Sequence, residues 1–202
     1  MRSGSLSPDA ISFNAAISAC AKAGEWGSGL IALQAMRHSN VAPDGISYSA
    51  LVNACEKAEQ WERAMWALAE MPRRAVEASV VTYNSAISAC SKGAEWERAL
   101  GLLGKVASGH GLLPDVVTVN AAIDACKKAA QWERALETFA ELRQRSLKPT
   151  SASLNVAISA CEKGGRWEQA LLLLLGMVRA GLRLEILTFN AAVSACEKGG
   201  QW

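Results

Sequence analysis

The stretch VTYNSAISACSKGAEWERALGLLGKV, residues 81–106, decides the fold, because close versions of it recur along the whole chain. Its cysteine returns at intervals of 35 or 36 residues, and a tryptophan follows six residues after each one. The cysteines are Cys20, Cys55, Cys90, Cys126, Cys161 and Cys196, and the tryptophans are Trp26, Trp61, Trp96, Trp132, Trp167 and Trp202. A fixed period of this length is typical of a solenoid, in which each unit buries its apolar face against its neighbours. We therefore expect function to lie on a surface of equivalent positions, not in one cleft.

The pattern inside one unit indicates two amphipathic helices joined by a small or glycine-bearing turn. In the first unit Phe13, Ile17 and Cys20 are spaced four and three apart, which places them on one face of a helix. The second segment opens at the tryptophan and is again apolar at helical spacing. The sequence therefore predicts an all-α fold, a right-handed α-solenoid of stacked helix-turn-helix hairpins with about 35 residues per repeat.

Alignment on the cysteines divides the chain into five complete units and two partial ones. Residues 1–9 match the tail of a unit, because they and residues 36–44 both run from a methionine to Pro-Asp. We expect the chain to be a fragment of a longer array. The complete units span residues 10–44, 45–79, 80–115, 116–150 and 151–185, and a partial sixth unit spans residues 186–202.

Composition narrows the classes of function. Half of the 202 residues are apolar, which is enough to form a hydrophobic core. The net charge is only +2, so the overall charge argues only weakly for a nucleic-acid partner. The sequence has no apolar run long enough to cross a membrane, no histidine paired with a nucleophile, no phosphate-binding loop and no metal-ligand spacing. We expect no membrane contact, no catalysis, no cofactor and no metal. Equivalent cysteines on stacked helices lie too far apart for disulfides, which favours a reducing compartment.

The repeat resembles the pentatricopeptide repeat family in its form V-T-Y-N-x-x-I-x-x-C-x-K, followed by E-W-E-R-A-L and a terminal P-D. The tetratricopeptide repeat is the nearest alternative, but its tryptophan lies early in the first helix, whereas here it opens the second. The resemblance implies binding of single-stranded RNA, one nucleotide per repeat, in organellar RNA processing, stability or translation. It also implies a mitochondrial or chloroplast location, other RNA-processing proteins as partners, and no DNA. The alternative function is a protein–protein interaction scaffold of tetratricopeptide-like type.

The resemblance implies that the fifth and the last residue of each repeat together select the base. An asparagine amide suits this role, since it offers both a donor and an acceptor; an exposed polar position or a local backbone hydrogen bond is the alternative. By the family's code the target is 5′-U-purine-U-pyrimidine-pyrimidine-3′. The selecting residues are Asn14, Asp44, Ser49, Ser79, Asn84, Asp115, Asn120, Thr150, Asn155, Glu185 and Asn190.

Two more registers complete the expected interface. The second residues sandwich each base by resemblance, or else pack between repeats; they are Ile11, Ile46, Val81, Val117, Ala152 and Leu187. A lysine eight residues after each selecting position is expected to contact phosphate, or to complement the helix dipole. These lysines are Lys22, Lys57, Lys92, Lys128, Lys163 and Lys198. We expect the tryptophans to lie in the core and not to stack on bases.

Overall fold

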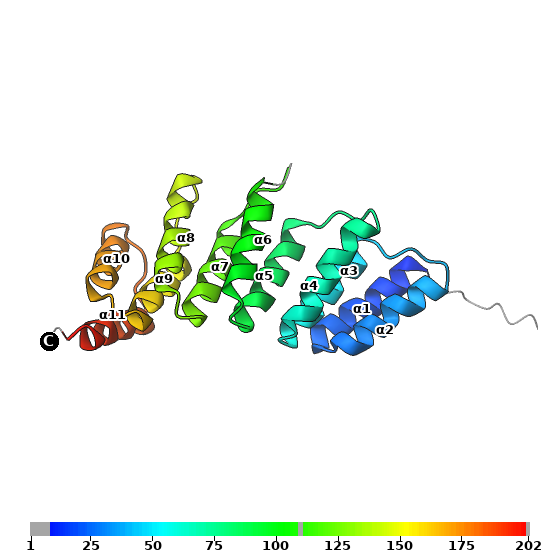
Figure 1. Cartoon of the computed structure of the whole chain (residues 1–202), viewed down its shortest axis with the longest axis horizontal. Coiled ribbons are helices and arrows are strands. Elements are labelled where there is room, and N and C mark those ends of the chain that lie inside the picture. Colours follow the sequence, from blue (N-terminus) through cyan, green and yellow to red (C-terminus); the bar gives the residue numbers. More distant parts are fainter. Residues whose placement is uncertain (1–8, 109–110, 201–202) are drawn as a thin grey trace, which may run out of the picture. The chain divides into compact units, whose positions relative to one another are not determined.

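The computed structural model describes residues 9–108 and 111–200 of the chain. These residues form eleven α-helices and no strand, which confirms the all-α prediction (Figure 1). The first helices of the repeats are α1 (Ala10–Ala23), α3 (Gly45–Lys57), α5 (Val80–Lys92), α7 (Val116–Lys128), α9 (Ser151–Lys163) and α11 (Ile186–Lys198). The second helices are α2 (Trp26–His38), α4 (Trp61–Arg73), α6 (Trp96–Ser108), α8 (Trp132–Gln144) and α10 (Trp167–Arg179). Residues 1–8 of the expected leading tail, and Trp202, lie outside the described residues.

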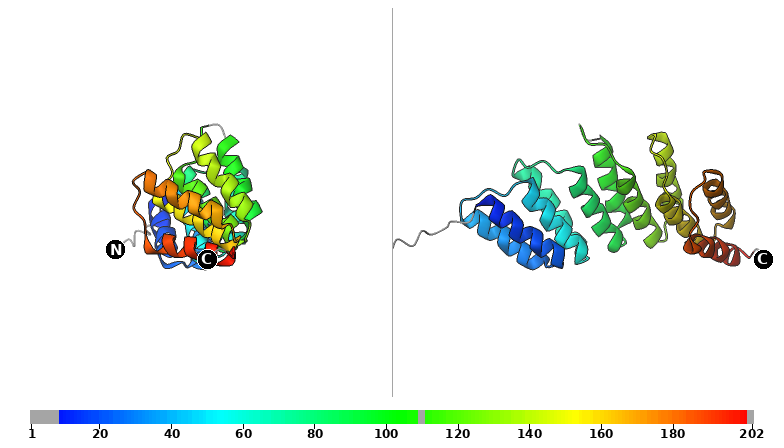
Figure 2. Two further views of the ribbon diagram at one scale, coloured as in Figure 1. Left: turned by 90° about the vertical axis from the view of Figure 1, so that its left-hand side faces the viewer. Right: turned by 180° about the vertical axis from the view of Figure 1, so that it is seen from behind.

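The helices group into two compact units, each made of several repeats. The first unit ends at Ala89 and the second unit begins at Cys90. In the first unit α1 packs against α2 and α3, and α3 packs against α4. In the second unit α7 packs against α8 and α9, and α9 packs against α10 and α11 (Figure 2). In these contacts neighbouring first helices pack against one another, and α2, α4, α8 and α10 each pack against the first helix of their own repeat.

Three first helices, α3, α7 and α9, begin at a cap supplied by the last residue of the preceding repeat. The Asp44 carboxylate accepts the backbone N–H of Ser47 at 2.9 Å, and the Ser47 hydroxyl accepts the Asp44 N–H in return. Asp115 and Thr150 form the same reciprocal arrangement at the starts of α7 and α9. This is a capping box, which satisfies two backbone donors at a helix start. In these repeats the last residue therefore also caps the next helix, whereas Glu185 makes no side-chain cap at the start of α11.

The carbonyl of the recurring cysteine closes the first helix. The Cys126 carbonyl accepts the N–H of Gln131, five residues on, at 2.8 Å, which is the Schellman arrangement. Ala130, just before it, has a left-handed φ of 58°, and its equivalent in the next repeat is Gly165 at 62°. The turn imposes this conformation with or without glycine, so an alanine at this position is conformationally strained.

Equivalent apolar positions build the core. The eighth residue of each complete repeat is fully buried: Ile17, Val52, Ile87, Ile123 and Ile158. Four of the cysteines are also buried, and burial raises the pKa of each to about 11: Cys55, Cys90, Cys126 and Cys161. These thiols serve as small apolar core residues.

The tryptophans do not lie in the core as expected; those that the structure describes at this register are half-buried. Trp132 shows the reason, since it packs between two repeats near the turn. Its ring lies so close to Gly164 that an added Cβ would stand 2.5 Å from ring carbon Cγ. The Arg166 guanidinium covers the ring at 4.1 Å from its centroid. Trp132 therefore joins neighbouring repeats and remains partly exposed to solvent.

Among the described helices, none combines the length and the apolar character needed to cross a bilayer. Nor do histidine, cysteine and carboxylate side chains gather there into a cluster suited to a metal ion.

Candidate nucleic-acid interface

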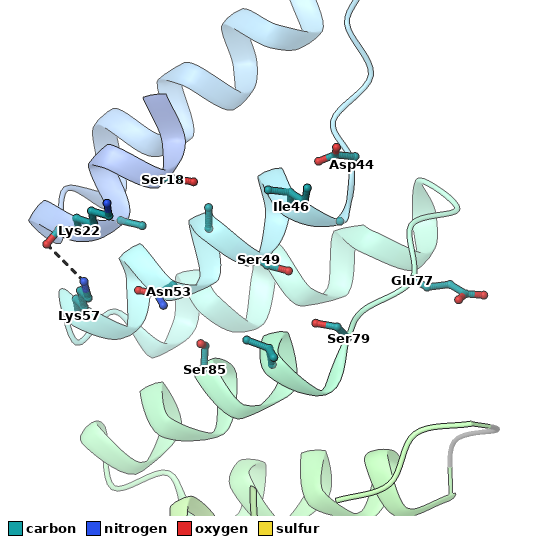
Figure 3. Close-up of a pocket in the computed structure, with 14 residues that line it drawn as sticks. Ser18, Lys22, Asp44, Ile46, Ser49, Asn53, Lys57, Glu77, Ser79 and Ser85 are labelled. Atoms are coloured by element: carbon teal, nitrogen blue, oxygen red, sulfur yellow. Dashed lines mark hydrogen bonds between the residues drawn. The ribbon is translucent and has the colours of Figure 1, made fainter. Parts of the chain in front are cut away.

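A groove of about 590 Å³ on the first unit brings together members of all three predicted registers (Figure 3). Its walls come from the exposed faces of α1, α3 and the start of α5. The predicted residues that line it are Asp44, Ser49, Ser79, Ile46, Val81, Lys22 and Lys57. The geometry therefore places apolar side chains, short polar groups and ammonium groups around one space large enough for a nucleotide.

The second residues of the repeats stand in solvent. Ile46 is 62% exposed and Val81 is 68% exposed on the two sides of the groove. Equivalent side chains on the other first helices are exposed as well, from Ile11 to Leu187. Exposure on this scale contradicts the alternative that these residues pack between repeats. A regular row of exposed apolar side chains is available to stack against a flat ligand.

Asn14 and Asp44, the first selecting pair, are joined to each other by hydrogen bonds. The Asn14 amide nitrogen donates to both carboxylate oxygens of Asp44 at 3.2 Å, and the Ser47 hydroxyl donates to the Asn14 amide oxygen at 2.5 Å. Asn14 is thus neither a free exposed amide nor bonded to its local backbone, the two alternatives that the sequence left open. It is fixed in place by the cap of the next helix.

This network also sets the charge of Asp44. Burial favours the neutral carboxyl, but hydrogen bonds from Ser47 and Asn14 outweigh it and hold the pKa of Asp44 below its ordinary value. The group is ionised at neutral pH and presents a fixed negative charge beside the Asn14 amide.

The fifth repeat has the same arrangement in the second unit. Asn155 donates to Glu185 at 3.4 Å, and the Thr188 hydroxyl donates to the Asn155 amide oxygen at 2.6 Å. With Leu187, these three residues line a smaller recess of about 180 Å³. The geometry of the first repeat therefore recurs with a longer acid.

The second repeat replaces the amide with hydroxyl groups. Ser49 and Ser79 do not contact each other directly; each shares a hydrogen bond with Thr82, at 2.6 and 3.0 Å. Both hydroxyls are short, so they leave more of the groove open than an asparagine would.

The remaining selecting residues differ in their surroundings. Asn120 has a buried amide oxygen with no hydrogen-bond partner among the described residues, and the Thr150 hydroxyl pairs with Ser153. Asn190 is exposed. Asn84 lies in the first unit and Asp115 in the second.

All six lysines of the ladder are exposed, but they are not equivalent. Lys57 donates to the Lys22 carbonyl at 3.4 Å, and both line the groove. In the second unit Lys128 pairs with Asp124 at 3.1 Å, and Lys198 pairs with Glu162 at 3.0 Å. Carboxylates therefore offset part of the positive charge there.

Sequence reasoning overlooked some groove residues: Ser18, Asn53, Glu77 and Ser85. Helical spacing carried a usable signal for Asn53, which lies four residues after Ser49 and four before Lys57 on the same helix.

Two comparisons identify the repeat. The model of the PPR repeat family matches residues 46–92 and 114–163, and that of the PPR repeat matches residues 11–41, 81–108 and 152–182. Together these ranges make up more than half of the chain. No curated protein sequence matches it significantly.

Solved structures of similar fold come from the same family. The pentatricopeptide repeat protein PPR10 from maize is 25% identical with a TM-score of 0.72, over 95% of this chain and 27% of that one. PPR10 in complex with an 18-nt psaJ RNA element gives a TM-score of 0.77 at 25% identity, over 96% of this chain. This chain therefore spans only 28% of PPR10.

A more distant structure agrees in fold. The PPR domain of Arabidopsis thaliana protein-only RNase P 1, in complex with tRNA, has a TM-score of 0.77 at 14% identity, over 90% of this chain and 95% of that one. These likenesses confirm the α-solenoid class of about 35 residues per repeat. With the family matches along its length, the chain belongs to the pentatricopeptide repeat family.

Proposed function

We propose that this chain binds single-stranded RNA along its first helices, one nucleotide per repeat. The groove of the first unit carries the proposal. It brings together the exposed side chains of Ile46 and Val81, the hydroxyls of Ser49 and Ser79, and two of the six lysines, Lys22 and Lys57. Stacking surface, hydrogen-bonding groups and positive charge are the three things that single-stranded nucleic acid requires of a protein.

In this arrangement a base lies between Ile46 and Val81 with its edge toward Ser49 and Ser79. Lys22 and Lys57 contact the adjoining phosphates. At the first repeat the Asn14 amide oxygen has two lone pairs, of which Ser47 uses one. The second lone pair accepts the N3–H of uracil, and Asp44 keeps the amide from turning.

The family's code extends this scheme to a target of 5′-U-purine-U-pyrimidine-pyrimidine-3′. The pairs Asn14–Asp44 and Asn84–Asp115 select uridine, and Ser49–Ser79 selects a purine. The pairs Asn120–Thr150 and Asn155–Glu185 select pyrimidines. The PPR10 complex with its RNA element supports RNA as the ligand class.

We further propose that the repeats act in organellar RNA processing, stability or translation, in a mitochondrion or chloroplast, without catalysing a reaction themselves. The match to protein-only RNase P 1 supports this division of labour, because the matched chain is that enzyme's PPR domain.

The test is fluorescence anisotropy with labelled RNA of the predicted sequence, its complement and the matching DNA, each at two salt concentrations. We expect tight, salt-dependent binding of the predicted RNA alone, weakened when Asn14 and Asn84 are both changed to alanine. Gln34→Ala is the matched control, since that amide is exposed on α2 and belongs to none of the three registers. Equal or absent binding to all three ligands would refute RNA reading and favour a protein partner.

A further inference from the structure

Asn53 occupies a distinctive place in the groove of the first unit. It lies on α3 one helical turn after Ser49 and one turn before Lys57, and all three line the groove (Figure 3). Its side chain is half-buried and makes no hydrogen bond with any residue in the described ranges. A primary amide in this state has an unused donor and an unused acceptor facing the ligand space.

Comparison with other repeats explains why this amide is unused. In two other repeats the residue equivalent to Asn53 is bonded to a glutamate of the repeat before it: Ser88 donates to Glu56 at 2.8 Å, and Ser194 donates to Glu162 at 2.9 Å. At the position of those two glutamates, the first repeat has Ala21, which offers no side-chain acceptor. Asn53 therefore has no partner across the repeat boundary.

The order of groups along α3 points to what Asn53 contacts. Ile46 and Ser49 lie at the place proposed for the base, and Lys57 lies at the place proposed for the phosphate. Each step from Ser49 to Asn53 to Lys57 is about 6 Å along the helix. In a nucleotide the ribose joins the base to the phosphate, so the group between their binding residues faces the sugar.

We propose that Asn53 is a specificity residue that hydrogen-bonds the ribose 2′-hydroxyl of the nucleotide held by the second repeat. The 2′-hydroxyl both donates and accepts, as the amide does, and its presence distinguishes RNA from DNA. This inference rests on the proposed function and adds a recognition element outside the three predicted registers. It makes the second repeat the place where the array rejects deoxyribose.

The experiment is a 2′-deoxy scan of the predicted five-nucleotide RNA, with one ribose replaced at a time and anisotropy as the readout. We expect the substitution at the second nucleotide to weaken binding to the unaltered protein about fivefold, the equivalent of one net hydrogen bond. Asn53→Ala should bind the all-ribose RNA about fivefold more weakly and show no further loss on that substitution.

Ser88→Ala is the matched control, because the hydroxyl at this equivalent position is already bonded to Glu56. This variant should keep the full deoxy penalty at the second nucleotide. Circular dichroism checks that both variants are as helical as the parent.

The possible outcomes distinguish failure of the proposed Asn53 contact from failure of RNA binding itself. A flat deoxy scan with normal RNA binding, or a penalty that persists in Asn53→Ala, overturns the role of Asn53 and leaves RNA binding intact. Failure of the all-ribose RNA to bind overturns both.

Discussion

The hydrogen-bond network at the first repeat predicts that Asn14→Ala destabilises the protein, although the residue is at a position proposed to read a base. The substitution removes the amide's contact with the Asp44 carboxylate and the hydrogen bond from Ser47. Bonds of this kind contribute about 1 kcal/mol each, and somewhat more when one partner is charged. Partial exposure of the pair reduces this gain, and alanine recovers up to about 0.7 kcal/mol of helix propensity. We expect a net loss of about 1 kcal/mol.

Asn190→Ala supplies the reference, because the same residue type at the same register makes no hydrogen bond within the described part of the chain. That variant gains the helix propensity of alanine and loses nothing. Urea unfolding followed by circular dichroism should therefore show Asn14→Ala with a lower midpoint than the parent, and Asn190→Ala with an equal or higher one. Equal midpoints for the two variants would refute the idea that the selecting pair is also a structural link.

Acidity provides a second check on the same network. Because the pKa of Asp44 is depressed in the folded state, its stabilising contribution is present above the unfolded value and is lost as pH falls through the folded value. The destabilisation caused by Asn14→Ala should shrink as pH falls through the lowered pKa of Asp44, because the carboxylate then becomes protonated. A difference that stays constant from neutral pH down to the onset of acid unfolding would show that the carboxylate charge plays no part.

Two further substitutions test contacts between repeats. Gly164→Ala should lower the free energy of unfolding by about 1–3 kcal/mol in urea, because the new Cβ would stand 2.5 Å from the Trp132 ring. Gly176→Ala is the control and should not destabilise the protein, because the space around Gly176 is open. Equal effects of the two substitutions would show that the tryptophan moves aside freely. Glu162→Gln should strengthen RNA binding, because it releases Lys198 from its ion pair. The slope of log binding constant against log salt concentration should also become steeper by up to about 0.7. Weaker binding would contradict a phosphate role for Lys198.

The sequence was sufficient for the helix pattern and the period of the repeat. The spacing of Ile17 and its equivalents specified the buried face of each first helix, and the spacing of the cysteine and tryptophan specified the period. The buried face depends on local helical geometry, and the period is read directly from the recurrence of the same residues along the chain. The exposed apolar register from Ile11 to Leu187 was also visible as a pattern, although only the structure showed that it faces solvent.

Contacts across repeat boundaries were not predictable in the same way. Trp132 was expected in the core, but its ring packs on Gly164 of the next repeat and remains half-buried. Asp44 was assigned only a base-selecting role, although it also caps α3. Both errors arise because residues about 30 apart meet only after neighbouring hairpins stack, and periodicity within one unit does not reveal which side chains then pair.

The same limitation explains why a uniform lysine register need not act uniformly. The six lysines look equal in the sequence, but the residue before each of them differs. Ala21 precedes Lys22, whereas Glu162 precedes Lys163 and also forms an ion pair with Lys198. An ion pair with a nearby carboxylate already neutralises the ammonium, so contact with phosphate releases less counterion and contributes less affinity. The Ala21 that leaves Lys22 without a neighbouring acid also leaves Asn53 without a partner. Ala21 in the first repeat thus accounts for the unused amide of Asn53, in a groove where Lys22 and Lys57 stand beside the carboxylates of Asp44 and Glu77.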